Sequence, residues 1–316
     1  MADAILNSDN LVKTYEEVEA VKGISFEIQR GEIFSLLGPN GAGKTTTISM
    51  LSCLVQPSNG EAWVDGHSIL KENDAVKRVI GVVPQEIALY PTLSARENLA
   101  FWGKMYGLRG QQLKERIAAV LDIAGLTDRA SEKIENYSGG MKRRINIAVG
   151  LLHEPKLLYM DEPTVGIDPQ SRRRILDTVL ELKERGLTVL YTTHYMEEAE
   201  ELSDRIGIID HGELIAIGSQ DELTRTVGQT DTLHIGLEPN GMDTQALLAG
   251  FQKIGGVEQS DLEENELYVQ AQDANTVIGD IVSSIDKAGG RIRSLEVREP
   301  NLEAVFLNLT GRALRD

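Results

Sequence analysis

Four short apolar runs along the chain end next to polar residues. They are "IFSLL" at 33–37, "RVIGVVPQ" at 78–85, "KLLYMDEP" at 156–163 and "LTVLYTTH" at 187–194. Continuous apolar runs of this length are typical of strands that are covered on both faces, as in a parallel sheet. The pattern therefore predicts an α/β fold around a mixed, mainly parallel sheet.

Two other stretches, at 11–28 and 60–69, alternate between apolar and polar residues. Alternation of this kind is typical of hairpins with one buried face, so we expect an antiparallel β layer beside the sheet. The stretches at 94–108 and 112–126 have the apolar spacing of amphipathic helices instead. We interpret the region from about 87 to 150 as an inserted helical subdomain.

The pattern changes after residue 228. From 229 to 316 the chain reads as strand, helix, two strands, helix, strand and a final helix. The first six of these elements follow the β-α-β-β-α-β order of ferredoxin-like folds. We therefore predict a larger domain over 1–228 and a small accessory α+β domain over 229–316.

Composition narrows the class of protein. The chain has 316 residues, a formal net charge of −17 and a single cysteine, Cys53. The negative charge argues against a protein that coats DNA or RNA, although a local nucleotide site needs no overall positive charge. Cys53 lies in an apolar stretch and is expected in the core. No apolar run has the length of a membrane span and no leader is recognisable, so we expect a cytosolic protein.

The segment "GPNGAGKT", Gly38–Thr45, matches the phosphate-loop pattern between a predicted strand and a predicted helix. Its glycines let backbone N–H groups approach phosphates, Lys44 adds a cation, and the Thr45 hydroxyl can ligate Mg²⁺. A glycine-rich turn without a ligand is the simpler alternative, which the flanking elements disfavour. The residues expected to bind ATP are Tyr15, through stacking on the base, and Gly38, Pro39, Asn40, Gly41, Ala42, Gly43, Lys44, Thr45 and Thr46.

Polar groups follow the other apolar runs at their carboxyl ends, where ligands of open α/β sheets bind. Gln85, Asp161 and His194 should therefore meet Lys44 at one place. Asp161 can hold Mg²⁺ through water, Gln85 can complete the metal or water shell, and His194 can contact the γ-phosphate. Glu162 should point away from Asp161 on an extended chain and act as general base, worth about 10²–10⁴-fold in rate. A helix cap or a structural histidine would explain each residue singly, but not the joint pattern.

A second anion-binding pattern, "YSGGMKRR", lies at 137–144. Ser138, Gly139 and Gly140 precede a basic helix, which is the arrangement of an anion site at a helix N-terminus. One ATP cannot easily use both sites of the same chain. Two chains facing head to tail would hold each ATP between the phosphate loop of one and Ser138–Gly140 of the other. The alternative is that Ser138 simply caps a core helix.

These motifs have the order and spacing of an ABC transporter ATP-binding subunit, which the chain resembles over residues 4 to about 228. The resemblance rests on "GPNGAGKTT", Gln85, "YSGGMKRR", "LLYMDEP", "GID" at 166–168 and His194. It implies the P-loop ABC ATPase fold, with Ser138–Gly140 as the signature motif that binds the other subunit's nucleotide. It also implies that Tyr15 stacks on adenine and that Asp168 belongs to the loop at the dimer interface.

"YSGGMKRR", "EPTVGIDP" and "TTHYMEEAE" most resemble the daunorubicin-resistance type of drug exporter. The resemblance implies ATP hydrolysis coupled to export, with Mg²⁺ as cofactor. It implies a homodimer or heterodimer of ATPase subunits, held at the inner face of the cell membrane by permease subunits, with no nucleic-acid partner. The implied catalytic residues are Glu162, His194 and Gln85, and the implied metal-site residues are Thr45, Gln85 and Asp161.

Two other functions fit the same motifs. An importer ATPase would share every catalytic residue, and a soluble ABC ATPase could act on DNA or ribosomes. The second class usually has long coiled coils or two phosphate loops per chain, and neither is present in the sequence. The ending "LEAVFLNLTGRALRD" resembles the accessory domain of the same exporters. We prefer stabilisation of the dimer as the role of this domain. Contact with the membrane partner and ligand sensing are the alternatives.

Overall fold

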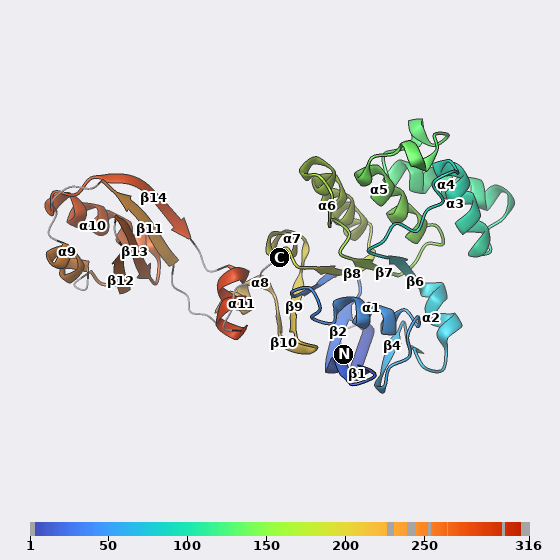
Figure 1. The fold of residues 1–316 in the computed structure, drawn as a ribbon, viewed down its shortest axis with the longest axis horizontal. Helices are drawn as coiled ribbons and strands as arrows, with labels where there is room; N and C mark the ends of the chain where they lie inside the picture. The colour runs from blue at the N-terminus through green and yellow to red at the C-terminus, as the bar shows by residue number, and fades with distance from the viewer. Residues whose placement is uncertain are drawn as a thin grey trace. The chain divides into compact units, whose positions relative to one another are not determined.

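The computed structural model describes residues 4–225, 231–238, 244–251, 254–263, 265–298 and 301–310. Contacts divide the chain into a unit over Met1–Ser219 and a second over Gln220–Ala313 (Figure 1). The division falls slightly before the predicted domain boundary after residue 228. That boundary lies outside the described residues and stays a prediction.

An antiparallel sheet forms one layer of the first unit, in the strand order β2-β1-β4-β5. Its strands are β1 (Ala4–Tyr15), β2 (Val18–Gln29), β4 (Asn59–Val64) and β5 (His67–Ser68). Tyr15 pairs with Val18 across a two-residue turn, and Val64 pairs with His67. Buried and exposed positions alternate along much of β1, β2 and β4, and the antiparallel pairing of β1 with β2 and of β4 with β5 confirms the two predicted hairpins.

A six-stranded sheet forms the centre of the first unit, in the order β10-β9-β3-β8-β7-β6. Its strands are β3 (Ile33–Leu37), β6 (Ile80–Val83), β7 (Leu157–Asp161), β8 (Thr188–Thr193), β9 (Arg205–Asp210) and β10 (Glu213–Gly218). All neighbours pair in parallel except β9 and β10. Every residue of β3, β7 and β8 is buried, so the continuous apolar runs correctly predicted a parallel sheet covered on both faces.

Helices cover the sheet and form the inserted subdomain. Those next to the strands are α1 (Lys44–Leu51), α2 (Asn73–Val79), α6 (Pro169–Glu184) and α7 (Met196–Leu202). The subdomain contains α3 (Ala95–Met105), α4 (Gly110–Ile123) and α5 (Gly139–Gly150), with 3₁₀ turns at Thr127–Arg129 and Ile134–Asn136. Figure 1 shows α3, α4 and α5 grouped together, as predicted for the region from 87 to 150. A capping box of Ser94 and Glu97 fixes the start of α3.

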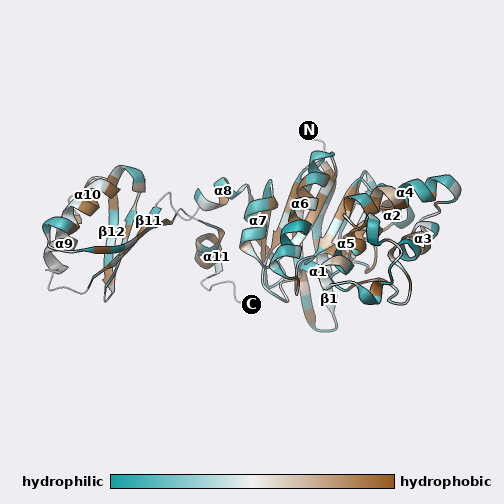
Figure 2. Cartoon of the chain, turned by 90° about the horizontal axis from the view of Figure 1, so that it is seen from above, coloured by the Kyte–Doolittle hydropathy of each residue, from teal (hydrophilic) through white to brown (hydrophobic). Residues whose placement is uncertain are grey.

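Burial follows the amphipathic pattern of these helices. On α6, Ile175, Val179 and Leu182 are buried at helical spacing, and charged side chains occupy the other face. Figure 2 shows this division as brown and teal parts of the same helix. No helix among the described residues is both long and apolar enough to cross a membrane.

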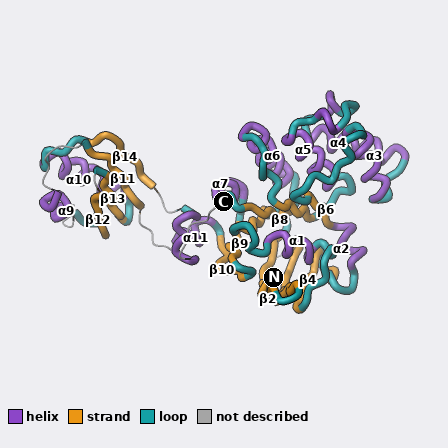
Figure 3. The backbone as a smooth tube through the Cα atoms, viewed as in Figure 1, coloured by secondary structure: helices purple, strands orange, loops and turns teal. Residues whose placement is uncertain are grey.

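The second unit contains α8 (Gln220–Arg225), β11 (Asp231–Leu237), α9 (Thr244–Phe251), β12 (Val257–Glu263), β13 (Glu266–Ala271), α10 (Ala274–Lys287), β14 (Ile292–Arg298) and α11 (Leu302–Thr310). Its strands form an antiparallel sheet in the order β12-β13-β11-β14. Helices α9 and α10 pack on this sheet through a core that includes Leu233, Phe251, Val269 and Ile281 (Figure 3). This is the predicted ferredoxin-like order.

A chain cut after Ser219 is expected to fold and to keep its nucleotide affinity. The buried clusters of the first unit draw on residues 5–214, and the cluster of the second unit on 233–292, so the cut divides neither core. We expect the thermal midpoint of the first unit to change by less than about 4 °C, which corresponds to about 1 kcal/mol. Circular dichroism melting and ATP titration calorimetry of the fragment test this. An unfolded fragment would show that the first unit depends on the second.

Candidate active site

The predicted phosphate loop, Gly38–Thr45, connects β3 to α1. Only glycine fits two of its positions. A Cβ atom at Gly38 would lie 2.1 Å from the Ile209 carbonyl oxygen, and Gly43 caps α1 with a φ of 106°. The close backbone path leaves the first N–H groups of α1 facing a cavity, which is the arrangement that binds phosphate.

The Lys44 side chain is held inside this loop. Its ammonium donates hydrogen bonds to the carbonyl oxygens of Gly38 at 2.6 Å and Pro39 at 2.9 Å. It also lies 2.9 Å from Oε1 of Glu162, and both side chains are almost fully buried. Phosphate oxygens that enter the loop must therefore compete with Glu162 for Lys44.

Three polar residues at the ends of neighbouring strands converge on this place: Gln85 and His194, as predicted, and Glu162 in the position predicted for Asp161. Glu162 follows β7, Gln85 lies beyond β6, and His194 follows β8. Nε2 of Gln85 lies 3.4 Å from Oε2 of Glu162, and Nδ1 of His194 lies 3.4 Å from its Oε1. Lys44, Gln85 and His194 thus surround one buried carboxylate.

Glu162 reaches this position by a backbone conformation that the sequence analysis did not anticipate. We expected an extended chain, but Glu162 has a φ of 41°, in the left-handed region that costs a non-glycine residue about 1–2 kcal/mol. Its N–H group lies 3.0 Å from Oγ1 of Thr192 and 3.2 Å from the Thr192 carbonyl oxygen, and these contacts hold the turn. Strained residues of this kind concentrate at functional sites.

Asp161 was expected to meet Lys44 at the same place, but it does not line the cavity. It is 4 % exposed, and its Oδ1 accepts a 2.7 Å hydrogen bond from Oγ1 of Thr192. Thr45 and Gln85 do line the cavity. Hydroxyl, amide and carboxylate oxygens are the hard ligands that Mg²⁺ prefers, and Mg²⁺ commonly keeps several waters. The Thr45 hydroxyl and the Gln85 amide oxygen are therefore donors that fit a magnesium ion.

The cavity has a volume of about 640 Å³, enough for a nucleotide. Tyr15 lies at its rim with 44 % of its surface exposed, where it is available for stacking. Two lining residues, Ala20 and Val165, were missed, because small and aliphatic side chains carry no chemical signal in a sequence. The lining residues are Tyr15, Ala20, Asn40, Gly41, Gly43, Lys44, Thr45, Thr46, Gln85, Glu162, Val165 and His194.

The second predicted anion site lies at the start of α5 and does not line this cavity. Oγ of Ser138 accepts a 3.2 Å hydrogen bond from the Met141 N–H group, so Ser138 caps the helix. Ser138 and Gly139 are exposed, whereas a Cβ atom at Gly140 would lie 2.1 Å from Oγ of Ser171 on α6. Ser138 is therefore the N-cap of α5, and its exposed side chain is also accessible to a second molecule.

Asp168, expected at a dimer interface, caps the start of α6. Its Oδ1 accepts a 3.0 Å hydrogen bond from the Ser171 N–H group, and this bond lowers the pKa of the carboxyl group. Cap and interface roles are compatible, because the cap uses one carboxylate oxygen.

Arg143 is a functional candidate that the sequence analysis missed. It lies on α5 and is 3 % exposed, and burial lowers its pKa. Its guanidinium donates to the carbonyl oxygens of Pro84 at 2.7 Å and Gln85 at 2.5 Å. Asn146, one turn later, holds the next part of the same loop through the Ala88 N–H group. The helix that begins with Ser138 therefore fixes the segment that carries Gln85.

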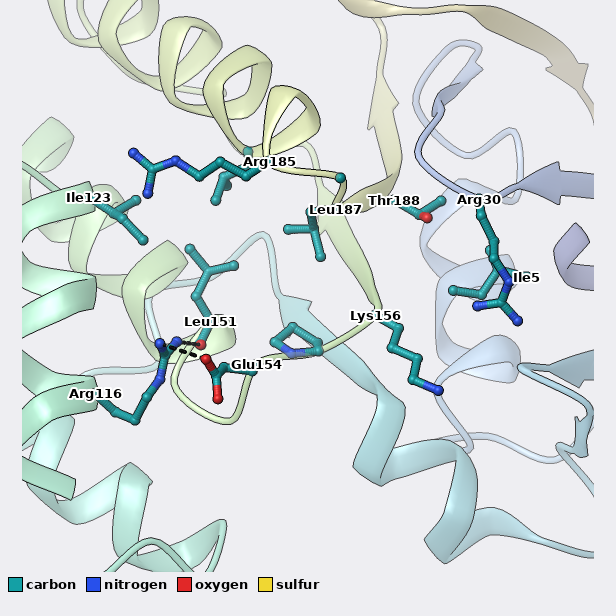
Figure 4. A pocket seen from close by; sticks show the side chains of 13 residues that line it. Ile5, Arg30, Arg116, Ile123, Leu151, Glu154, Lys156, Arg185, Leu187 and Thr188 are labelled. Carbon is teal, nitrogen blue, oxygen red and sulfur yellow. Dashed lines mark hydrogen bonds and ion pairs between the residues drawn. The ribbon is translucent and has the colours of Figure 1, made fainter. Parts of the chain in front are cut away.

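A separate cavity of about 380 Å³ lies by the amino ends of β7 and β8, at the edge of the sheet opposite the nucleotide site (Figure 4). Its basic side chains are engaged in ion pairs: Arg116 lies 3.0 Å from Glu154, and Arg30 and Lys156 each lie 2.6 Å from Asp65. None of the predicted site residues lines it. The chemistry therefore belongs to the cavity at the carboxyl ends of the strands.

The sequence is similar along its whole length to ATP-binding proteins of bacterial resistance systems. A family model described as ABC transporter matches residues 21–165. The linearmycin resistance ATP-binding protein LnrL of Bacillus subtilis is 53% identical over 314 residues, covering 99% of this chain and 100% of that protein. The daunorubicin/doxorubicin resistance ATP-binding protein DrrA of Streptomyces peucetius is 36% identical, covering 98% and 94%.

Solved structures of ATP-binding cassettes resemble a large part of the chain. An ATP-binding cassette determined as a dimer in a post-hydrolysis state, with ADP and Pi, is 30% identical. It superimposes with a TM-score of 0.62 and covers 68% of this chain and 98% of that one.

Proposed function

The chain belongs to the ABC transporter ATP-binding proteins, and we propose that it hydrolyses ATP to drive export of a drug-like or lipid-like compound through separate membrane subunits. The observation that carries this proposal is the 53% identity to the linearmycin resistance ATP-binding protein across the full length of both chains. The ABC ATPase fold predicted from the sequence is confirmed by the solved relatives. Relatives named for drug resistance or Nod factor export favour an exporter over an importer or a DNA-acting ATPase.

Each residue of the site has a role that its surroundings support. The N–H groups at the start of α1 and the Lys44 ammonium bind the phosphates, and Tyr15 stacks on the base. Glu162 accepts the proton of the attacking water, which the cavity can admit beside Gln85 and His194. A magnesium ion held by Thr45 and Gln85, with Asp161 behind a water, would neutralise charge on the phosphates. Proton acceptance by a positioned carboxylate contributes about 10²–10⁴-fold to the rate.

The active unit of this proposal is a dimer of ATPase subunits. The signature residues Ser138–Gly140 do not line the cavity of their own chain, yet Ser138 and Gly139 are exposed at a helix N-terminus. In a head-to-tail dimer they close the nucleotide site of the other subunit. A homodimer and a heterodimer satisfy this requirement equally.

Membrane subunits need a docking surface, and an apolar one lies near Gln85. Ile87, Tyr90 and Phe101 are each between 37 % and 44 % exposed. Met105, which lies on α3 with Phe101, is 69 % exposed. The Tyr90 and Phe101 rings are 5.0 Å apart. We infer that this docking patch, Ile87, Tyr90, Phe101 and Met105, receives a cytoplasmic segment of the permease and holds the ATPase at the inner membrane face.

Copurification with the membrane subunits tests the export proposal. The parent protein should copurify with them from detergent extracts, and its ATPase rate should rise when the transported compound is added. Phe101→Asp should lose the membrane subunits but keep the basal rate of the isolated protein, because the patch lies outside the cavity. Phe101→Leu, which stays apolar, is the matched control. Full copurification of Phe101→Asp would remove the docking patch from the proposal.

A further inference from the structure

One buried carboxylate near the site has no role in the chemistry described above. Glu198 lies on α7 and is 2 % exposed. It does not line the nucleotide cavity. We propose that Glu198 is a positioning residue, which holds the loop after Glu162 against the strand end that carries His194. The inference rests on the proposed ATPase function, because it assigns Glu198 to the same reaction.

The Glu198 carboxylate accepts hydrogen bonds from hydroxyl groups of two separate segments. Its Oε1 accepts a 2.6 Å hydrogen bond from Oγ1 of Thr164. Its Oε2 accepts from the Tyr191 hydroxyl at 2.9 Å and from Oγ1 of Thr193 at 3.0 Å. A buried carboxylate needs such donors, because its desolvation is costly unless it is hydrogen-bonded or paired.

The donor positions explain what the carboxylate holds. Thr164 comes two residues after Glu162 and opens the loop that leads to Asp168. Thr193 directly precedes His194, and its Oγ1 also accepts a 2.9 Å hydrogen bond from the Tyr195 N–H group. Glu198 therefore joins the segment of the general base to the segment of the histidine.

Arg172 completes the cluster from α6. Its Nε lies 3.6 Å from Oε1 of Glu198, and its guanidinium lies 4.4 Å from the centre of the Tyr195 ring. The Tyr195 ring is in turn 4.1 Å from the His194 ring. The charge of Glu198 is thus balanced by a cation that also restrains the residue after His194.

The effect on catalysis follows from the geometry of the base. Glu162 already has a strained backbone, and its carboxylate lies 3.4 Å from His194. A shift of the flanking loop would move both the base and the interface loop at Asp168. Misplacement of a reacting group by about 1 Å can cost about 10²-fold in rate. Binding of the phosphates by Lys44 would be spared, since Lys44 is held by its own loop.

Two substitutions break the link from opposite sides. Glu198→Gln keeps the size of the side chain but replaces one acceptor oxygen with an NH₂ donor that faces hydroxyl groups. Thr164→Val keeps the shape and removes the hydroxyl, while Thr164→Ser keeps the hydroxyl. Glu197→Gln, at the exposed neighbouring position on the same helix, is the matched control.

The readouts separate positioning from a structural role. We expect Glu198→Gln and Thr164→Val each to lower kcat about 10–100-fold, with KM and the calorimetric ATP affinity within about threefold of the parent. The kcat of the double variant should fall no further than that of the worse single variant, because both substitutions break the same hydrogen bond between Thr164 and Glu198. Thr164→Ser and Glu197→Gln should keep the parent rate.

Other results overturn the inference. Parent kcat in Glu198→Gln or Thr164→Val, or losses that multiply in the double variant, would leave Glu198 a purely structural residue. A fall in thermal midpoint with unchanged kcat would lead to the same conclusion. If Glu198→Gln does not fold, the Thr164 pair decides alone. A parent protein that does not hydrolyse ATP would instead contradict the proposed function.

Discussion

Replacement of Glu162 by glutamine is expected to lower the ATPase rate about 10²–10⁴-fold without weakening ATP binding, because the amide cannot accept a proton from water. The structure also explains why ATP binding should not weaken. The Glu162 carboxylate lies 2.9 Å from the Lys44 ammonium and competes with phosphate for it. Removal of that charge should leave the affinity for ATP equal to or higher than that of the parent.

Turnover assays measure the ATPase rate, and calorimetry with Mg-ATP measures the affinity separately. Since ATP persists in the variant, gel filtration should also show a nucleotide-dependent dimer. Glu181→Gln, at an exposed carboxylate on α6, controls for the loss of a negative charge. A Glu162→Gln protein that turns over at the parent rate would move the role of general base to another residue.

The convergence of the site could be predicted because strand ends in a parallel sheet meet at one edge. The apolar runs of β6 and β8 are each followed by a polar residue, and the phosphate loop has a fixed spacing, so Lys44, Gln85 and His194 could be placed without coordinates, whereas Glu162 occupies the position predicted for Asp161. The order of elements in the second unit was equally accessible, since alternation and helical spacing are local properties.

The supporting contacts could not be predicted, since they join residues far apart in the chain. Arg143 reads as part of the basic run "KRR", yet it is buried and donates to Pro84 and Gln85, about sixty residues earlier. Glu198 reads as one member of the acidic run "EEAEE", and nothing local distinguishes it from exposed Glu197. The left-handed turn at Glu162 could not be predicted either. An extended strand also directs neighbouring side chains to opposite sides, so nothing in the sequence indicated a positive φ there.

The shared nucleotide site makes the other prediction with a large effect. Ser138→Arg should block the signature face with a bulky cation, and Lys44→Ala should remove the cation of the phosphate loop. Each variant alone would form dimers with two defective sites and should be nearly inactive. Ser138→Ala removes the cap on the Met141 N–H group, which costs about 1 kcal/mol of helix stability, and also removes the hydroxyl proposed to contact the other subunit's nucleotide.

A mixture of Ser138→Arg and Lys44→Ala should recover activity if the site is shared. In each mixed dimer, one site combines the intact phosphate loop of the first chain with the intact signature of the second, and the other site carries both lesions. Random pairing makes half of the dimers mixed, so independent sites should restore about one quarter of the parent rate. If both sites must act together, nucleotide should still be trapped at one site per mixed dimer. Mixed dimers that neither turn over nor trap nucleotide would reduce Ser138 to the helix cap that it forms within its own chain.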